Sequence, residues 1–86
     1  MYNIVLEKQA IKDFKHIERT ELKYKVAELL RLIHNNPFQN PPHYKKLKGH
    51  NNRYSRRINK RHRLVYEIYE GSIIKIVSMW THYENI

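Results

Sequence analysis

The fold of this chain is decided by residues 54–66, where basic and apolar side chains alternate at the two-residue period of a β-strand. Two runs carry the alternation: Tyr54-Ser55-Arg56-Arg57-Ile58-Asn59 and His62-Arg63-Leu64-Val65-Tyr66. Only a short basic turn separates them, and a connection this short requires antiparallel neighbours. We therefore expect a hairpin whose strands span about residues 54–59 and 63–69.

The alternation also assigns the side chains of the hairpin to two faces. The second strand gives two sets, Leu64, Tyr66 and Ile68 toward a core, and Arg63, Val65 and Glu67 away from it. Ile58 is expected in the core, which turns Arg57 outward beside Arg63. We expect this second face to be partly open to solvent.

Apolar residues three and four positions apart predict two helices before the hairpin. The first spans about residues 8–18, and its stripe contains Ala10, Ile11, Phe14 and Ile17. Its polar residues Lys8, Lys12, Asp13 and Lys15 are expected on a solvated face. The second helix starts near Thr20 as N-cap and ends before Pro37, and its stripe contains Leu22, Val26, Leu29, Leu30 and Ile33.

Strands are also expected at residues 2–6 and 73–80, with an irregular loop from 37 to 52. Apolar residues occupy both parities of the last strand, which indicates either a bulge or a partly buried outer face. The order is β-α-α-β-β-β in a single domain, residues 1–86. We expect an α+β fold in which a helical hairpin packs on one face of a mostly antiparallel sheet.

Charge is strongly segregated along the chain. The formal net charge is +9, and no aspartate or glutamate occurs from Leu29 to Tyr66. That segment holds ten basic residues, Arg31, Lys45, Lys46, Lys48, Arg53, Arg56, Arg57, Lys60, Arg61 and Arg63. The rest of the chain is nearly neutral, so the cations are concentrated where a polyanion such as RNA would bind.

Other classes of function find little support. The chain has no cysteine, and its six histidines, at 16, 34, 43, 50, 62 and 82, lack the spacing of a metal site. We expect no metal and no other cofactor. The apolar runs are shorter than a membrane span and the N-terminus lacks a secretion signal, so we expect a cytoplasmic protein without membrane contact.

Several motifs together are similar to the YoeB/Txe branch of the RelE-fold bacterial toxins. They are Tyr54-Ser55-Arg56-Arg57-Ile58-Asn59, His62-Arg63-Leu64-Val65-Tyr66, Trp80-Thr81-His82-Tyr83, Asn36-Pro37-Phe38 and Lys46-Leu47-Lys48-Gly49. The resemblance covers essentially the whole chain. It implies a RelE-like fold and a toxin of a type II toxin–antitoxin pair that cuts messenger RNA in the ribosomal A site.

The resemblance also implies site residues. The two functional arginines of the family match Arg57 and Arg63, its C-terminal histidine and tyrosine match His82 and Tyr83, and its loop lysine matches Lys48. Such chemistry needs a base for the 2′-hydroxyl, cations for the phosphorane and an acid for the leaving oxygen. Arg57 and Arg63 suit the second role, and His82 suits the third. Further RNA contacts are expected from Lys45, Lys46, Lys48, Arg53, Arg56, Lys60 and Arg61.

One position departs from the family pattern. The branch typically has a glutamate, thought to be the general base, where this chain has Lys45. Lysine and histidine are the only replacements in the segment: His43, Lys45, Lys46, Lys48, His50 and His62, with Glu67 and Glu84 as more distant carboxylates. We hypothesise that Lys45 or Lys48 is the base. The alternative is a weakened homologue that acts by RNA or ribosome binding, or by autoregulating transcription when antitoxin-bound.

The expected partners follow from the charge and the resemblance. An acidic, partly disordered antitoxin would fold across the basic face and neutralise it. The other partners are mRNA and the ribosome. The sequence leaves open whether the chain also forms a homodimer, and whether the tail Glu84-Asn85-Ile86 has a role.

Overall fold

The predicted hairpin is the centre of the computed structural model, which describes residues 1–80. It pairs β3 (Arg53–Arg57) with β4 (Arg63–Tyr69) in antiparallel register, and Tyr54 lies opposite Tyr66. In the same register Arg57 lies opposite Arg63. The hairpin predicted from the alternation is therefore confirmed.

The remaining strands extend this hairpin on both sides into one sheet with the order β1-β5-β4-β3-β2. On one side β5 (Ile73–Ser78) is antiparallel to β4, and β1 (Asn3–Leu6) is parallel to β5. On the other side β2 (Tyr44–Lys46) is antiparallel to β3. The α+β class and a mostly antiparallel sheet are confirmed, but β2 was wrongly expected to be loop.

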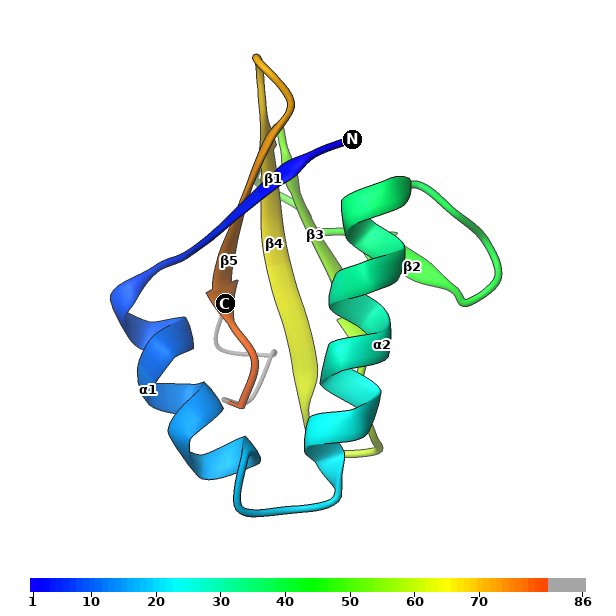
Figure 1. Ribbon diagram of the computed structural model, residues 1–86. Helices are drawn as coiled ribbons and strands as arrows, with labels where there is room; N and C mark the ends of the chain where they lie inside the picture. Colours follow the sequence, from blue (N-terminus) through cyan, green and yellow to red (C-terminus); the bar gives the residue numbers. More distant parts are fainter. Residues whose placement is uncertain (81–86) are drawn as a thin grey trace.

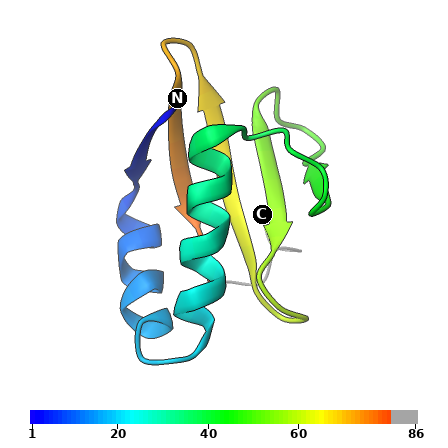
Figure 2. The ribbon, with the colours of Figure 1, turned by 45° about the vertical axis from the view of Figure 1, so that its right-hand side comes forward.

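Two helices cover one face of this sheet, as Figures 1 and 2 show. They are α1 (Lys8–Ile17) and α2 (Leu22–Asn35). Thr20 lies between them, and its hydroxyl donates to the carbonyl of Ile17 (2.8 Å) and accepts from the N–H of Leu22 (3.1 Å). Thr20 thus joins the helices two residues before α2 begins, instead of flanking it directly as an N-cap.

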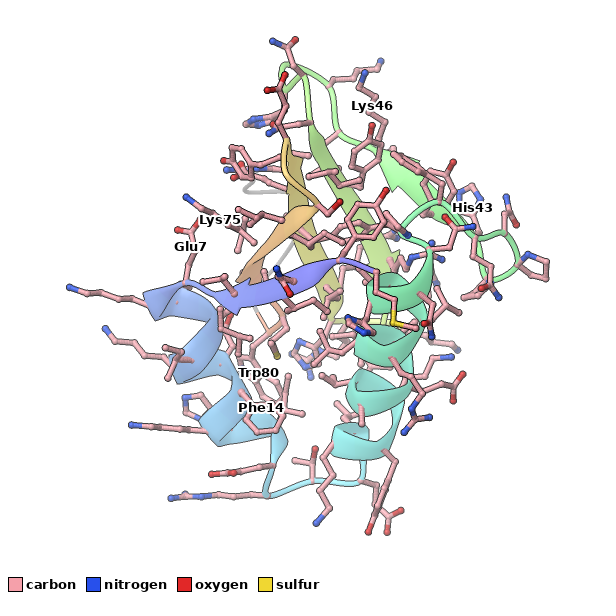
Figure 3. All side chains as sticks on the ribbon, turned by 45° about the horizontal axis from the view of Figure 1, so that its top comes forward. Glu7, Phe14, His43, Lys46, Lys75 and Trp80 are labelled. Atoms are coloured by element: carbon pink, nitrogen blue, oxygen red, sulfur yellow. The ribbon has the colours of Figure 1, made fainter. Side chains whose placement is uncertain are left out.

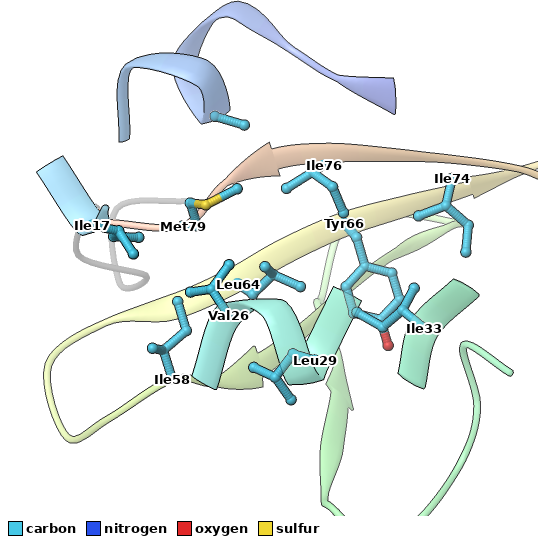
Figure 4. Packing of buried hydrophobic residues seen from close by; sticks show 11 residues of the cluster. Ile17, Val26, Leu29, Ile33, Ile58, Leu64, Tyr66, Ile74, Ile76 and Met79 are labelled. Atoms are coloured by element: carbon cyan, nitrogen blue, oxygen red, sulfur yellow. The ribbon is translucent and has the colours of Figure 1, made fainter. Parts of the chain in front are cut away.

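The core lies between the helices and the inner face of the sheet (Figure 4). It consists of Ala10, Ile17, Val26, Leu29, Ile33, Ile58, Leu64, Tyr66, Ile74, Ile76 and Met79. Burying each large apolar side chain contributes about 1.5–3 kcal/mol before the entropy of ordering is subtracted. The helical periodicity therefore predicted most of the helix contribution to the core.

Two residues of α1 lie where the periodicity did not place them. Asp13, expected on the solvated face, is 2% exposed, and its carboxylate accepts the N–H of Met79 at 3.0 Å. Ile11, expected in the core, is 46% exposed. The backbone N–H of Met79, just after β5, is buried and requires a hydrogen-bond acceptor. The carboxylate of Asp13 is that acceptor, which explains why Asp13 is buried.

The ambiguity of the last strand is resolved by a bulge. Tyr66 pairs with Ile76, but the preceding Val65 pairs with Ser78, so Val77 is the extra residue. The bulge reverses the inward parity, which lets Ile74, Ile76 and Met79 all reach the core.

The outer face of the sheet is more enclosed than expected. Arg63 and Glu67 are each 8% exposed, and Ser55 and Val65 are fully buried. The predicted orientation of these side chains is right, but the expected openness at this part of the face is wrong. No helix among residues 1–80 is long and apolar enough to cross a membrane.

Candidate functional site

Two arginines lie opposite each other on the outer face of the sheet. Arg57 is exposed at the end of β3, and Arg63 is nearly buried at the start of β4. Directly opposed residues of an antiparallel pair have Cβ atoms about 4.5–5.5 Å apart. Both side chains leave the sheet on the same face, and guanidinium groups bind phosphate oxygens in a bidentate manner. The pair is therefore suited to hold a phosphate.

Ser55 fixes one member of this pair and connects it to Lys45. The Nε–H of Arg63 donates to the hydroxyl of Ser55 at 3.1 Å. Lys45 of β2 lies directly opposite Ser55, so its side chain leaves the sheet on the same face as both arginines. The register thus brings three predicted site residues to one face, which are Lys45, Arg57 and Arg63.

A pocket of about 570 Å³ opens at the end of this face. Its walls come from the β3–β4 turn, from α2 and from the segment before β2, and its lining residues are Lys25, Pro42, His43, Arg57, Ile58, Asn59, Lys60 and Arg63. Among the described residues that line it there is no carboxylate. Clustered cations without acids make this pocket a favourable place for a phosphate group next to the arginine pair.

Arg56 departs from the expected role as an RNA contact. Its side chain is fully buried on the helix side of the sheet. The guanidinium donates to the carbonyls of Pro37 (3.0 Å), Gln39 (2.8 Å) and Pro42 (2.7 Å), and to the hydroxyl of Tyr66 (3.2 Å). Each of its three nitrogens donates to a group inside the protein, so Arg56 holds the 37–42 loop in place, including Pro42 of the pocket wall.

Tyr66 completes the network around this buried arginine. Burial raises the pKa of Tyr66, although the Arg56 charge and hydrogen bond oppose that rise. The phenol therefore stays protonated and donates to the carbonyl of Pro37 at 2.9 Å.

Arg53 is engaged by the only carboxylate that β4 presents. Its guanidinium contacts the Glu67 carboxylate at 2.6 Å, and the Nε–H donates to it at 2.8 Å. Burial acts to raise the pKa of Glu67, but hydrogen bonds from Tyr69 and Arg53 outweigh it and the pKa is lowered. The hydrogen bond to Glu67 raises the pKa of Tyr69 in turn. Arg53, predicted to contact RNA, is therefore paired within the sheet.

The other predicted cations are dispersed. Lys46 lies opposite Tyr54, so its side chain and that of Lys45 leave β2 on opposite faces. Figure 3 shows Lys46 and His43 at the β2 side of the molecule. Lys48 is exposed in the turn after β2, near the Arg53 end of β3. Lys60 lines the pocket, and Arg61 is exposed in the same turn. Lys45 is thus closer along the sheet to the arginine pair than Lys48 is.

Two predicted catalytic residues, His82 and Tyr83, lie outside the described residues, as does the tail Glu84-Asn85-Ile86. Within residues 1–80, no group of three or more histidine, cysteine, aspartate or glutamate residues is placed to hold a metal ion.

Sequence reasoning missed Lys25, Ser55 and Asn59 as parts of this site. Lys25 comes from α2, and no local pattern links a helix residue to a turn more than thirty positions later. Ser55 could have been found, because the strand parity that selects Arg57 and Arg63 also selects it. Ser78 of β5 pairs with Val65 of β4. Its hydroxyl is also buried, and it makes no hydrogen bond among the described residues.

Solved structures of bacterial toxins share this architecture. The YoeB/ParE toxin from Agrobacterium tumefaciens superposes with a TM-score of 0.85 at 28% identity, over 96% of this chain and 100% of that one. YoeB in the YoeB–YefM complex from Staphylococcus aureus matches with a TM-score of 0.80 at 37% identity, over 96% of this chain and 99% of that one. The YoeB dimer from the same organism matches with a TM-score of 0.82 at 37% identity, over 95% and 98%.

A search of curated proteins by sequence found no match. The family model for the YoeB-like toxin of bacterial type II toxin–antitoxin systems, in contrast, matches residues 6–83. That range includes both helices, the strands β2 to β5 and the residues Lys45, Arg57 and Arg63. By sequence family and by fold, the chain belongs to the YoeB-like toxins of type II toxin–antitoxin systems.

Proposed function

We propose that this protein is a ribosome-dependent endoribonuclease that cuts mRNA in the A site and so inhibits translation. The observation that carries the proposal is the pairing of Arg57 with Arg63 on the face that also presents Lys45. The carboxylate-free pocket beside the pair supports it, because the substrate is a polyanion.

The reaction needs only groups that RNA and this chain supply. The 2′-oxygen attacks the adjacent phosphorus as a base removes its proton, and the bond to the 5′-oxygen breaks as an acid protonates that oxygen. The products are a 2′,3′-cyclic phosphate and a free 5′-hydroxyl. Arg57 and Arg63 stabilise the charge on the phosphorane, because guanidinium groups bind phosphate oxygens in a bidentate manner. His82 supplies the acid, and Tyr83 orients the substrate.

Lys45 is the proposed base. Its side chain leaves the sheet on the same face as Arg57 and Arg63. Lys48 lies at the other end of β3 and is the second candidate. The RNA strand is held by Lys60 and Arg61 of the β3–β4 turn.

The partner that silences the toxin is proposed to be an acidic antitoxin, in the cytoplasm of a bacterial cell. YoeB of Staphylococcus aureus has been solved in a YoeB–YefM complex and as a dimer. An acidic segment bound across Arg57 and Lys60 would compete directly with RNA for the same cations.

Primer extension on mRNA translated with purified ribosomes tests the proposal. The wild-type protein should produce discrete cuts at A-site codons, and Arg63→Ala and His82→Ala should abolish them. Lys23→Ala, which removes an exposed cation of α2 outside the pocket, is the control and should cut normally. Arrest of translation with intact message would refute the nuclease.

A second function is favoured by one observation, the lysine at position 45. A homologue without the family glutamate could act by occupying RNA or the ribosome, or by regulating transcription together with its antitoxin. Overexpression without growth arrest, combined with tight antitoxin binding, would support this second function over the first.

A further inference from the structure

The end of β5 is held at three points that the proposed reaction does not explain. The ring of Trp80 stacks on His62, with centroids 4.0 Å apart and planes at 13°, and on His16, at 5.7 Å and 21°. The Nδ1 atom of His62 is also hydrogen-bonded to the carbonyl oxygen of Trp80. One residue earlier, the carboxylate of Asp13 accepts the N–H of Met79. Two consecutive residues are thus fixed through both side chain and backbone.

The three residues that make these contacts come from two different elements. Asp13 and His16 belong to α1, whereas His62 belongs to the turn between β3 and β4. In Figure 3, Trp80 lies near Phe14 on the α1 side of the molecule. The end of β5 is therefore held from both sides.

The turn that carries His62 is itself well ordered by hydrogen bonds. The side-chain oxygen of Asn59 accepts the N–H groups of Arg61 (2.9 Å) and His62 (2.8 Å). The carbonyl of His62 accepts the N–H of Ile58 at 2.9 Å. Arg57 immediately precedes this turn and Arg63 immediately follows it, so His62 has a firm position relative to the arginine pair.

The hydrogen bond to Trp80 also determines the tautomer of His62. A carbonyl oxygen can only accept, so Nδ1 of His62 must carry a proton. A side chain that lacks this N–H loses the bond to the backbone, even when its ring can still stack on Trp80.

We propose that His62 is a positioning residue for the proposed cleavage, because it fixes the ring and the backbone of Trp80, two residues before His82 in the sequence. The inference rests on the proposed function, because His82 is the acid in that reaction. His62 connects Trp80, the last described residue, to the turn that lies between Arg57 and Arg63 in the sequence. Displacing a catalytic group by about 1 Å can cost about 100-fold in rate, so such a link has a measurable effect.

Two substitutions separate the bond from the stack. His62→Phe keeps an aromatic ring but removes the donor, and His62→Asn keeps an N–H donor but removes the ring. His34→Phe is the matched control, because Nδ1 of His34 is hydrogen-bonded to the carbonyl of Tyr2 at 2.6 Å, by the N-terminal strand. It loses the same type of bond elsewhere in the molecule.

The first readout requires no RNA. Trp80 is the only tryptophan, so fluorescence of the full-length protein that is excited selectively at tryptophan reports on this ring alone. We expect His62→Asn to shift the Trp80 emission to longer wavelength, because water replaces the stacked imidazole, while His34→Phe leaves it unchanged. An unchanged emission in His62→Asn would overturn the proposal.

The second readout is A-site cleavage by the folded variants. We expect His62→Phe to lower kcat about tenfold or more at unchanged KM, with a smaller loss in His62→Asn. In a His82→Ala background, His62→Phe should have no further effect, because both changes act through one group. A kcat loss equal to that of His34→Phe, or full additivity with His82→Ala, would contradict the proposal.

Failure of the proposed function gives a different result. A His82→Ala protein that cleaves at the wild-type rate would remove His82 as the acid. The emission shift in His62→Asn would then still decide whether His62 places Trp80.

Discussion

Arg56 and Arg57 are adjacent in the sequence, and their side chains have opposite surroundings. Arg56 is buried and bonded to three loop carbonyls, while Arg57 is exposed beside the pocket. Strand geometry alone separates them, because successive side chains leave the sheet on opposite faces. One arginine therefore supports the structure and the other is available to a ligand.

Replacing Arg56 should lower the stability of the protein, whereas replacing Arg57 should lower its activity. Arg56→Met leaves buried carbonyls without donors, so we expect the free energy of unfolding to fall by about 3 kcal/mol or more. Arg57→Ala should change it by only about 0.5 kcal/mol, while cleavage falls about 100-fold. Urea unfolding and primer extension on the two proteins measure both quantities. Equal stability losses would mean that the loop does not depend on Arg56.

Glu67 should make the stability of the protein depend on acid pH. Its pKa in the folded state lies below the usual value of 4.5, so its stabilising contribution is complete above 4.5. That contribution is lost as pH falls through the lower, folded-state pKa. We expect Glu67→Gln to reduce the free energy of unfolding at pH 6 and to have a progressively smaller effect in more acidic solution.

Glu70→Gln is the matched control for that titration, since Glu70 is exposed in the turn after β4. Its effect on unfolding should be small at every pH. A Glu67→Gln effect that stays constant from pH 6 to strongly acidic solution would argue against a role for the Arg53–Glu67 pair in this pH dependence.

At the scale of elements, β2 decides which lysine faces the arginine pair. Its three residues alternate, so Lys45 shares a face with Ser55 and Lys46 does not. This difference exists only because β2 pairs with β3. An irregular loop, as expected from the sequence, would have left both lysines equivalent.

We therefore expect Lys45→Ala to lower kcat for A-site cleavage by about 100-fold or more, in the range of a lost general base. Lys46→Ala removes the same charge from the opposite face and should lower kcat much less. Single-turnover cleavage with saturating ribosomes gives the comparison. If Lys45→Ala and Lys48→Ala both cut at the wild-type rate, no lysine is the base, and a strong gain in Lys45→Glu would identify the natural chain as a weakened nuclease.

Local periodicity predicted both helices, the hairpin and the shared face of Arg57 and Arg63. It could not predict β2, because a three-residue basic strand owes its existence to a neighbour in space and has little strand propensity of its own. It could not predict the burial of Arg56 either, because the carbonyls that make burial favourable come from the 37–42 loop. Lys25 joined the pocket through packing of α2, which no sequence spacing records.

For the whole molecule, the distribution of charge predicts how RNA binding responds to salt. The cations near the pocket include Lys25, Arg57, Lys60 and Arg63, while Lys12 and Lys15 line a separate hollow on α1. Binding of a single RNA strand releases about 0.7 counterions for each neutralised phosphate. About four contacts therefore give a slope of about −3 for log K against log salt concentration.

The double variant Arg57→Ala/Lys60→Ala should weaken binding of a short single-stranded RNA and make this slope less steep by about 1.4. Lys12→Ala/Lys15→Ala removes the same net charge from the helix layer, and it should leave the slope nearly unchanged if binding occurs at the pocket. Fluorescence anisotropy titrations from low to moderate salt measure both slopes. Equal reductions of the slope in the two variants would mean that RNA binding depends on the total charge of the protein. The pocket would then not be the specific binding site.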